Sequence, residues 1–167
     1  MTPAGHLALS WLAGRPLPAA ARPWLVAGGL APDADFALVL MDGFNGLHRG
    51  ATHSLAFAAL LGVAAALLAR GRRRAAGVAA AAGALIHLQL DAVLDGNATN
   101  GVGVALLWPF SGWMYSPVNL LATGCPGWDR PAAALACAGP GLLWELPVLL
   151  LAGLLFLRSR RRAPIPG

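Results

Sequence analysis

The sequence has little charge, no lysine and only two cysteines. Charged residues make up 11% of the 167 positions and hydrophobic residues 57%, and the mean hydropathy of +0.64 is high for a soluble globule. Cys125 and Cys137 do not form a Cys-x-x-Cys pair, which excludes a zinc ribbon and leaves a disulfide or two small thiols. The N-terminus lacks the early basic region of a standard signal peptide. The long Ala, Leu, Val and Gly stretches favour helices in lipid.

All 12 basic residues are arginine, and they give the chain a formal net charge of +5. Eight of them form two clusters, Arg70–Arg74 and Arg158–Arg162, each at the end of an apolar run. Basic clusters in such positions typically mark the cytoplasmic ends of membrane helices, so we do not interpret them as a nucleic-acid surface. The sequence therefore predicts the lipid bilayer as a partner and no nucleic acid.

The apolar stretches predict an all-α, polytopic membrane bundle with about three to four apolar helices, some of them short or kinked. No strand alternation and no internal repeat is visible. The expected helical stretches are 6–14, 22–41 with a break at Pro32, 54–69, 75–94, and 132–157 with kinks near Pro140 and Pro147. Residues 95–131 form a long connection whose aromatic residues suit a membrane interface. We assign residues 1–157 to one domain and 158–167 to a basic, disordered tail.

Against this apolar background, histidines and aspartates gather in short polar islands. The islands contain His6, then Asp33 and Asp35, then His48 and His53, then His87 and Asp91. Imidazoles and carboxylates are costly to bury unless they are paired or bind a metal ion. Taken together, these residues predict a site for divalent metal.

Two of the islands have a spacing that suits ligands. His87 and Asp91 are four residues apart, so a helix presents an imidazole nitrogen and a carboxylate oxygen to the same centre. Asp33 and Asp35 flank one residue at the expected helix break, where both carboxylates can turn to one point. Each residue alone also has a structural explanation. Either aspartate could cap a helix, and His87 could be a core histidine bonded to a carbonyl.

The island at 48–54 adds two imidazoles around a turn at Gly50. Taken alone, His48 could equally be a surface residue of the loop. We expect His53 to converge on one ion with His87, Asp91 and at least one of the two aspartates at 33 and 35. His48 should lie nearby, and His6 is a weaker member because it begins a helix near the chain terminus.

The order of these motifs resembles a known family. Pro-Asp-x-Asp at 32–35, His-Arg-Gly-x-Thr-His-Ser at 48–54, His-x-x-x-Asp at 87–91, Gly101 and Pro-Phe at 109–110 are similar to the YdjM-type family of bacterial inner-membrane, metal-dependent hydrolases. A more distant similarity connects them to the helical zinc-dependent phospholipase C and nuclease group. The chain lacks the His-x-x-x-Glu helix of that group. The resemblance therefore implies one or two zinc ions in place of a trinuclear site.

The activity that the resemblance implies is metal-assisted hydrolysis of a phosphoester, either a small molecule or a lipid. The ion would lower the pKa of a bound water toward about 7 and stabilise charge on phosphoryl oxygens. Arg49 either clamps a phosphate or contacts lipid headgroups or Asp42. Glu145 either joins the site as a ligand or proton-accepting base, or pairs with an arginine or a tryptophan indole.

Two other classes stay open from the sequence. A transporter would use intramembrane His and Asp as an ion path, but it would tend to spread them along the membrane depth and to show a repeat. A non-catalytic membrane protein would bind metal only for stability, with no open coordination position.

The arginine clusters also predict a topology. The positive-inside rule places the Arg70–Arg74 turn and the C-terminal tail in the cytoplasm, and the metal site toward the outer face. His53 and Asp91 are each roughly 26 Å from that turn along antiparallel helices, which brings them to one level. The same arithmetic places Glu145 close to the depth of His87.

Overall fold

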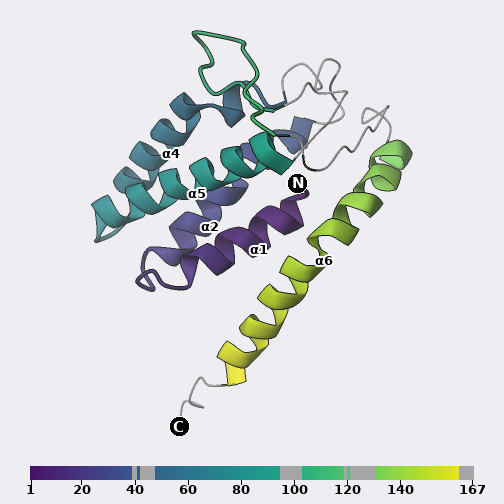
Figure 1. Cartoon of the computed structure of the whole chain (residues 1–167). Helices are drawn as coiled ribbons and strands as arrows, with labels where there is room; N and C mark the ends of the chain where they lie inside the picture. The colour runs from purple at the N-terminus through teal and green to yellow at the C-terminus, as the bar shows by residue number, and fades with distance from the viewer. Residues whose placement is uncertain (39–40, 42–47, 95–102, 119, 121–130, 162–167) are drawn as a thin grey trace.

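The computed structural model describes residues 1–38, 41, 48–94, 103–118, 120 and 131–161, without the side chains of 131–138, 140 and 141. Its helices are α1 (Pro3–Gly14), α2 (Arg22–Leu30), the 3-10 helices η1 (Pro32–Leu38) and η2 (Ala51–His53), α4 (Leu55–Leu68), α5 (Arg73–Leu94) and α6 (Pro131–Arg161) (Figure 1). The only pairing of extended chain among these residues is an isolated bridge between Val104 and Tyr115. The predicted all-α class is confirmed.

Local sequence signals explain where the helices that carry the site begin and end. Pro32 follows α2 directly, and the chain continues as η1, so the predicted break is confirmed. The hydroxyl of Ser54 accepts a hydrogen bond from the Phe57 backbone nitrogen at 3.1 Å and thereby caps α4. The hydroxyl of Thr2 caps α1 in the same way, through the backbone nitrogen of Gly5.

Glycines allow the helices at the centre of the bundle to approach one another until their backbones are in contact. A Cβ added to Gly28 of α2 would lie 2.0 Å from the Ala80 carbonyl oxygen, and one added to Gly83 of α5 would lie 2.1 Å from the Leu25 carbonyl oxygen. A Cβ on Gly77 would lie 2.7 Å from the Gly62 carbonyl oxygen of α4. Small residues at such contacts are typical of membrane helices. As Figure 1 shows, α5 lies between α2 and α4, and this packing fixes the residues at its C-terminal end.

Among the described residues, two of the three to four apolar helices expected are long enough to span a membrane: α5 and the part of α6 from Leu142 to Arg161. The third apolar helix, α4, has 14 residues, a length of about 21 Å against a hydrocarbon core of about 30 Å. Helix α6 runs as one element through Pro140 and Pro147 and continues to Arg161, so the first four residues of the expected disordered tail are helical. Residues 95–102, 119, 121–130 and 162–167 lie outside the described part. Cys125 and the side chain of Cys137 lie outside it too.

The bundle has a basic end. The connection from α1 to α2, the turn from α4 to α5 and the C-terminal end of α6 all lie toward the lower left of Figure 1. These segments carry most of the arginines, including Arg15, Arg22 and the cluster at 70–74. The C-terminal end of α5, with His87 and Asp91, lies at the opposite end.

Replacing Gly83 with alanine should lower the stability of the protein. The new Cβ would lie 2.1 Å from the Leu25 carbonyl oxygen and 2.7 Å from the Gly29 backbone nitrogen, so α2 and α5 would have to separate. Overpacking of this kind costs about 1–3 kcal/mol. Gly153→Ala is the matched control, because a Cβ there meets no described atom within 4 Å, and it should stabilise α6 by about 0.5–1 kcal/mol. Equal melting temperatures of the two variants in detergent would contradict the close packing of α2 and α5.

Candidate metal centre

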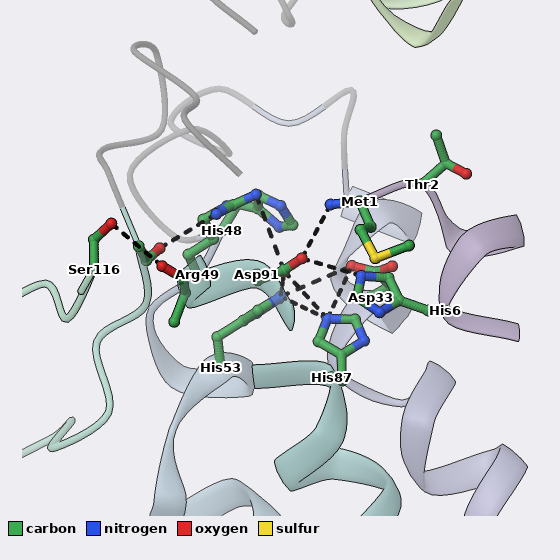
Figure 2. Close-up of polar contacts among 12 residues, drawn as sticks. Met1, Thr2, His6, Asp33, His48, Arg49, His53, His87, Asp91 and Ser116 are labelled. Atoms are coloured by element: carbon green, nitrogen blue, oxygen red, sulfur yellow. Dashed lines mark hydrogen bonds and ion pairs between the residues drawn. The ribbon is translucent and has the colours of Figure 1, made fainter. Parts of the chain in front are cut away.

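Four buried side chains from three elements point their ligand atoms at one another (Figure 2). Asp33 comes from η1, His53 from η2, and His87 and Asp91 from α5. Their four ligand atoms all lie within 4.8 Å of one another, and both imidazoles are 0% exposed. The structure thus brings together the pair at 87 and 91, the second histidine of the 48–54 island and one of the two aspartates.

The separations of these atoms match those around one metal ion. The Nε2 atoms of His53 and His87 are 3.2 Å apart, and each lies 3.4 Å from Asp91 Oδ2. Asp33 Oδ1 lies 3.8 and 3.6 Å from the same two nitrogens. A tetrahedral zinc ion with bonds of 2.0–2.2 Å would hold its ligand atoms about 3.3–3.6 Å apart. The donor set therefore fits one small divalent cation.

The outer nitrogens of the two imidazoles show which nitrogen faces the centre. His87 Nδ1 lies 2.8 Å from the Gly29 carbonyl oxygen, which can only accept, so this nitrogen donates. The Thr52 hydroxyl donates to Asp35 Oδ2 at 2.9 Å and accepts from His53 Nδ1 at 3.0 Å. In the neutral imidazoles both Nε2 atoms therefore present lone pairs beside two carboxylate oxygens. Acceptors in this arrangement need a proton or a metal ion between them, and outer partners of this kind are typical of metal-binding histidines.

Asp35 and His48 form an outer pair next to this centre. His48 Nδ1 lies 3.1 Å from both carboxylate oxygens of Asp35. Burial alone would raise the pKa of Asp35, but the hydrogen bond from His48, the charge of His48 and the Thr52 hydroxyl outweigh it and lower that pKa. Asp35, His48 and His53 also make a second group of three ligand atoms within 4.8 Å. Asp35 is also connected to His53 through the Thr52 hydroxyl.

His6 contacts the centre from α1. Its Nε2 lies 3.1 Å from Asp91 Oδ1, the oxygen that does not face the other imidazoles. Its ring stacks on His87 with centroids 3.6 Å apart and an angle of 18° between the planes. The Met1 nitrogen lies 3.1 Å from the same oxygen of Asp91. His6 thus orients Asp91 and belongs to neither group of ligand atoms.

Burial sets the protonation of the groups outside the spanning helices. It raises the pKa of Asp33 to about 6 and lowers the pKa of His53 and of His6 to about 4. Neutral imidazoles are the form that binds metal. Asp33 Oδ2 has no hydrogen-bond partner within the described part of the chain. This oxygen is therefore available to accept a proton.

Arg49 adjoins the centre. Its backbone has φ of 68°, in the left-handed region that few residues other than glycine adopt, and its side chain is 3% exposed. Its Nη1 donates to the Gly103 carbonyl oxygen at 3.3 Å, and its Nη2 lies 4.0 Å from Asp91 Oδ2. The alternative partner Asp42 lies outside the described residues.

Glu145 lies on α6 and is buried beside the start of α1. Its carboxylate accepts hydrogen bonds from the Thr2 backbone nitrogen, at 2.6 Å, and from the Thr2 hydroxyl. Thr2 takes the place of the arginine or indole partner considered from the sequence. The structure does not bring Glu145 into either group of ligand atoms.

The alternative that His87 bonds to a carbonyl is confirmed, but neither the identity of that carbonyl, Gly29, nor the Thr52 hydroxyl beside His53 was predicted from the sequence. Thr52 stands inside the 48–54 island directly before His53, and its position there was the available signal. The Gly29 carbonyl gives no such signal, because a backbone acceptor leaves no trace in residue identity. Its role depends on the close approach of α2 to α5.

The fold and the site together define an all-helical protein with apolar helices of spanning length and a buried His/Asp cluster that could hold a metal ion. The sequence matches the family model described as YdjM inner membrane protein over residues 1–163, so the chain belongs to this family. No curated protein and no solved structure matches it. The resemblance to the YdjM-type family is confirmed, and the family is one of the inner membrane.

Replacing His87 with alanine should remove the metal from the purified protein. The change deletes a ligand atom at the point where the separations are shortest, while alanine is well tolerated in a helix. We expect a fall from about one divalent ion per chain to below about 0.1, measured by elemental analysis. Gln89→Ala is the control on the same helix, because Gln89 is exposed. Equal metal content in the two variants would exclude His87 as a ligand.

Proposed function

We propose that this protein is a membrane-bound, metal-dependent hydrolase that cleaves a phosphoester, with one divalent ion, most simply zinc, in the centre described above. The observation that carries the proposal is the convergence of two imidazole Nε2 atoms and two carboxylate oxygens at 3.2 to 3.8 Å. The four side chains of this centre also lie together at one end of the bundle. Such a cluster supports a reaction centre over an ion path, which would spread them along the helices.

Three of the four side chains would hold the ion. His53, His87 and Asp91 form the tighter set, with separations of 3.2 to 3.4 Å. Two histidines and one carboxylate leave a coordination position open, as catalytic sites do. When bound, the ion would make a water more acidic and stabilise negative charge on the phosphoryl group.

Asp33 is the proposed proton acceptor. Its Oδ1 lies farther from the imidazoles, at 3.6 and 3.8 Å, and its Oδ2 has no partner among the described residues. A carboxylate in this position can take the proton from the attacking water at Oδ2. Arg49 would bind a phosphoryl oxygen, because its guanidinium adjoins Asp91 and a planar fork suits phosphate.

The remaining polar residues position these groups. Asp35 and Thr52 hold the His53 ring, and His6 holds Asp91 through its other oxygen. Glu145 acts indirectly. It accepts hydrogen bonds from Thr2, which caps the N-terminus of α1, and α1 carries His6. We therefore propose a positioning role for Glu145 in place of direct contact with substrate.

Asp33→Asn should abolish hydrolysis without removing the metal. The amide keeps the shape of the side chain but cannot accept the proton, and loss of a general base costs about 100-fold or more in rate. The test uses detergent-solubilised protein with bis(p-nitrophenyl) phosphate and phosphatidic acid as substrates, with metal content measured in parallel.

The comparison variant is Asp35→Asn, which removes an outer partner. It should weaken metal binding by about 10–100-fold, and added zinc should restore its activity. If Asp33→Asn loses the metal, or if the wild-type protein with full metal content cleaves no phosphoester, the centre is structural. Metal-dependent uptake of a cation by proteoliposomes in the absence of hydrolysis would instead establish a transporter.

We also propose a multi-pass orientation in which the arginine-rich end is cytoplasmic and the metal centre faces outward. In a chain with Cys125→Ser and Cys137→Ser, an Arg72→Cys variant should resist an impermeant thiol reagent in intact cells. A Gly112→Cys variant should react, because position 112 is exposed and follows the segment that hydrogen-bonds to Arg49 and to Leu55 of α4. Arg72 is preferred to Gly71, whose φ of 127° disfavours a side chain. Labelling of the first variant and protection of the second would reverse the orientation.

A further inference from the structure

A groove of about 370 Å³ separates α1 from α6. Its described lining residues are all apolar or glycine, and the groove is wide where they are small: Ala4 and Ala8 of α1, and Ala152 and Gly153 of α6. On each helix the lining residues follow the i, i+3, i+4, i+7 pattern of a single helix face. The groove is therefore built from two matching small-residue faces.

Contacts join α1 and α6 at both ends of the groove. At one end Glu145 accepts the hydrogen bonds of Thr2. At the other end the rings of Trp11 and Phe156 meet edge to face, with centroids 5.9 Å apart. Figure 1 shows α6 running beside α1 at the margin of the bundle, and only 6% of the spanning segment of α6 is buried. The groove therefore opens toward the surroundings of the helices.

A second cavity of about 260 Å³ continues the groove at the arginine-rich end, because Trp11 and Phe156 line both. Arg15 and Arg22 line this cavity, and none of its lining residues in the described part of the chain is acidic. Both arginines are exposed. The Arg22 Nε donates to the Leu17 carbonyl oxygen at 2.9 Å, which holds its guanidinium in place. A wholly apolar groove thus ends in a basic pocket.

We propose that the groove and the basic pocket bind one anionic phospholipid of the bilayer. One acyl chain lies between α1 and α6, and the phosphate binds Arg15 and Arg22. Arginine matches phosphate through paired hydrogen bonds, and the two arginines, with no acidic residue among the described lining, give the pocket a charge complementary to phosphate. From Ala4 to Arg15 helix α1 rises about 16 Å, close to half of the hydrocarbon core of about 30 Å. The length suits an acyl chain of one leaflet.

This lipid is a resident ligand and not the hydrolysed substrate. Its phosphate lies at the end of α1 that carries Arg15, whereas His6 and the metal centre lie at the other end. The binding site thus shares no residue with the centre formed by Asp33, His53, His87 and Asp91. Lipid binding and hydrolysis can fail separately, since metal content and lipid retention are measured on the same protein.

Filling the groove tests the position of the acyl chain. A side chain at Gly153 enters open space, since a Cβ there meets no described atom within 4 Å, so Gly153→Leu should fill the groove without disturbing the helix. Native mass spectrometry of the full chain, released from detergent with added phosphatidylglycerol, should show retained lipid falling by about tenfold. Gly139→Leu is the control: it is also on α6 with open space around its Cβ, but about 21 Å away along the axis.

Substituting the arginines tests the position of the phosphate. It also tests whether the lipid binds at this site if Gly153→Leu fails to fold. Arg15→Gln with Arg22→Gln should reduce retention of phosphatidylglycerol by about tenfold. Arg72→Gln with Arg73→Gln, at the same end of the bundle but outside the pocket, should not. The wild-type chain should retain phosphatidylglycerol in preference to phosphatidylcholine.

Three results would overturn the proposal. Equal retention of the two lipids would remove the role of charge. Wild-type retention in both the groove variant and the arginine pair would place the lipid elsewhere. A dimer that Gly153→Leu dissociates, with lipid retention unchanged, would assign the groove to a second copy of the chain.

Discussion

Four buried hydrogen-bond acceptors converge on one point, and the rest of the structure follows from the need to hold them there. The outer nitrogens of His53 and His87 donate to Thr52 and to the Gly29 carbonyl, so their inner nitrogens face Asp33 and Asp91 with lone pairs. Such a group is unfavourable in an apolar interior unless a cation neutralises it. A divalent ion would convert the most costly feature of the fold into one of its stabilising interactions.

The helix packing serves this centre directly. The carbonyl that orients His87 belongs to Gly29, and it reaches the imidazole because α2 and α5 touch at Gly28 and Gly83. Ser10 of α1 meets Gly29 on the other side, where an added Cβ would lie 1.9 Å from its hydroxyl oxygen. Glycines in these helices lower intrinsic helix propensity. Their presence here is explained by the close approach of three helices that carry site residues.

Much of the centre could be predicted from the sequence, for a physical reason. The four-residue spacing of His87 and Asp91 and the helix break at Pro32 are local properties, and both appear in the structure as expected. The choice between Asp33 and Asp35 could not be predicted, because it depends on how η1 turns its carboxylates. Of the three to four apolar helices expected, only two reach spanning length in the described part of the chain. The third, α4, is apolar but has 14 residues, and hydropathy depends on composition more than on helix length. The hydrogen bond between Thr2 and Glu145 joins residues that are 143 positions apart, and no local sequence pattern predicts such a contact.

The most direct test is X-ray absorption spectroscopy of the protein, purified without a histidine tag and loaded with one equivalent of zinc. Zinc bound in this centre should have a first shell of nitrogen and oxygen at about 2.0–2.2 Å with the scattering pattern of two imidazoles. A zinc spectrum without imidazole scattering, or with sulfur in the first shell, would contradict it. So would a protein that takes up no zinc at all.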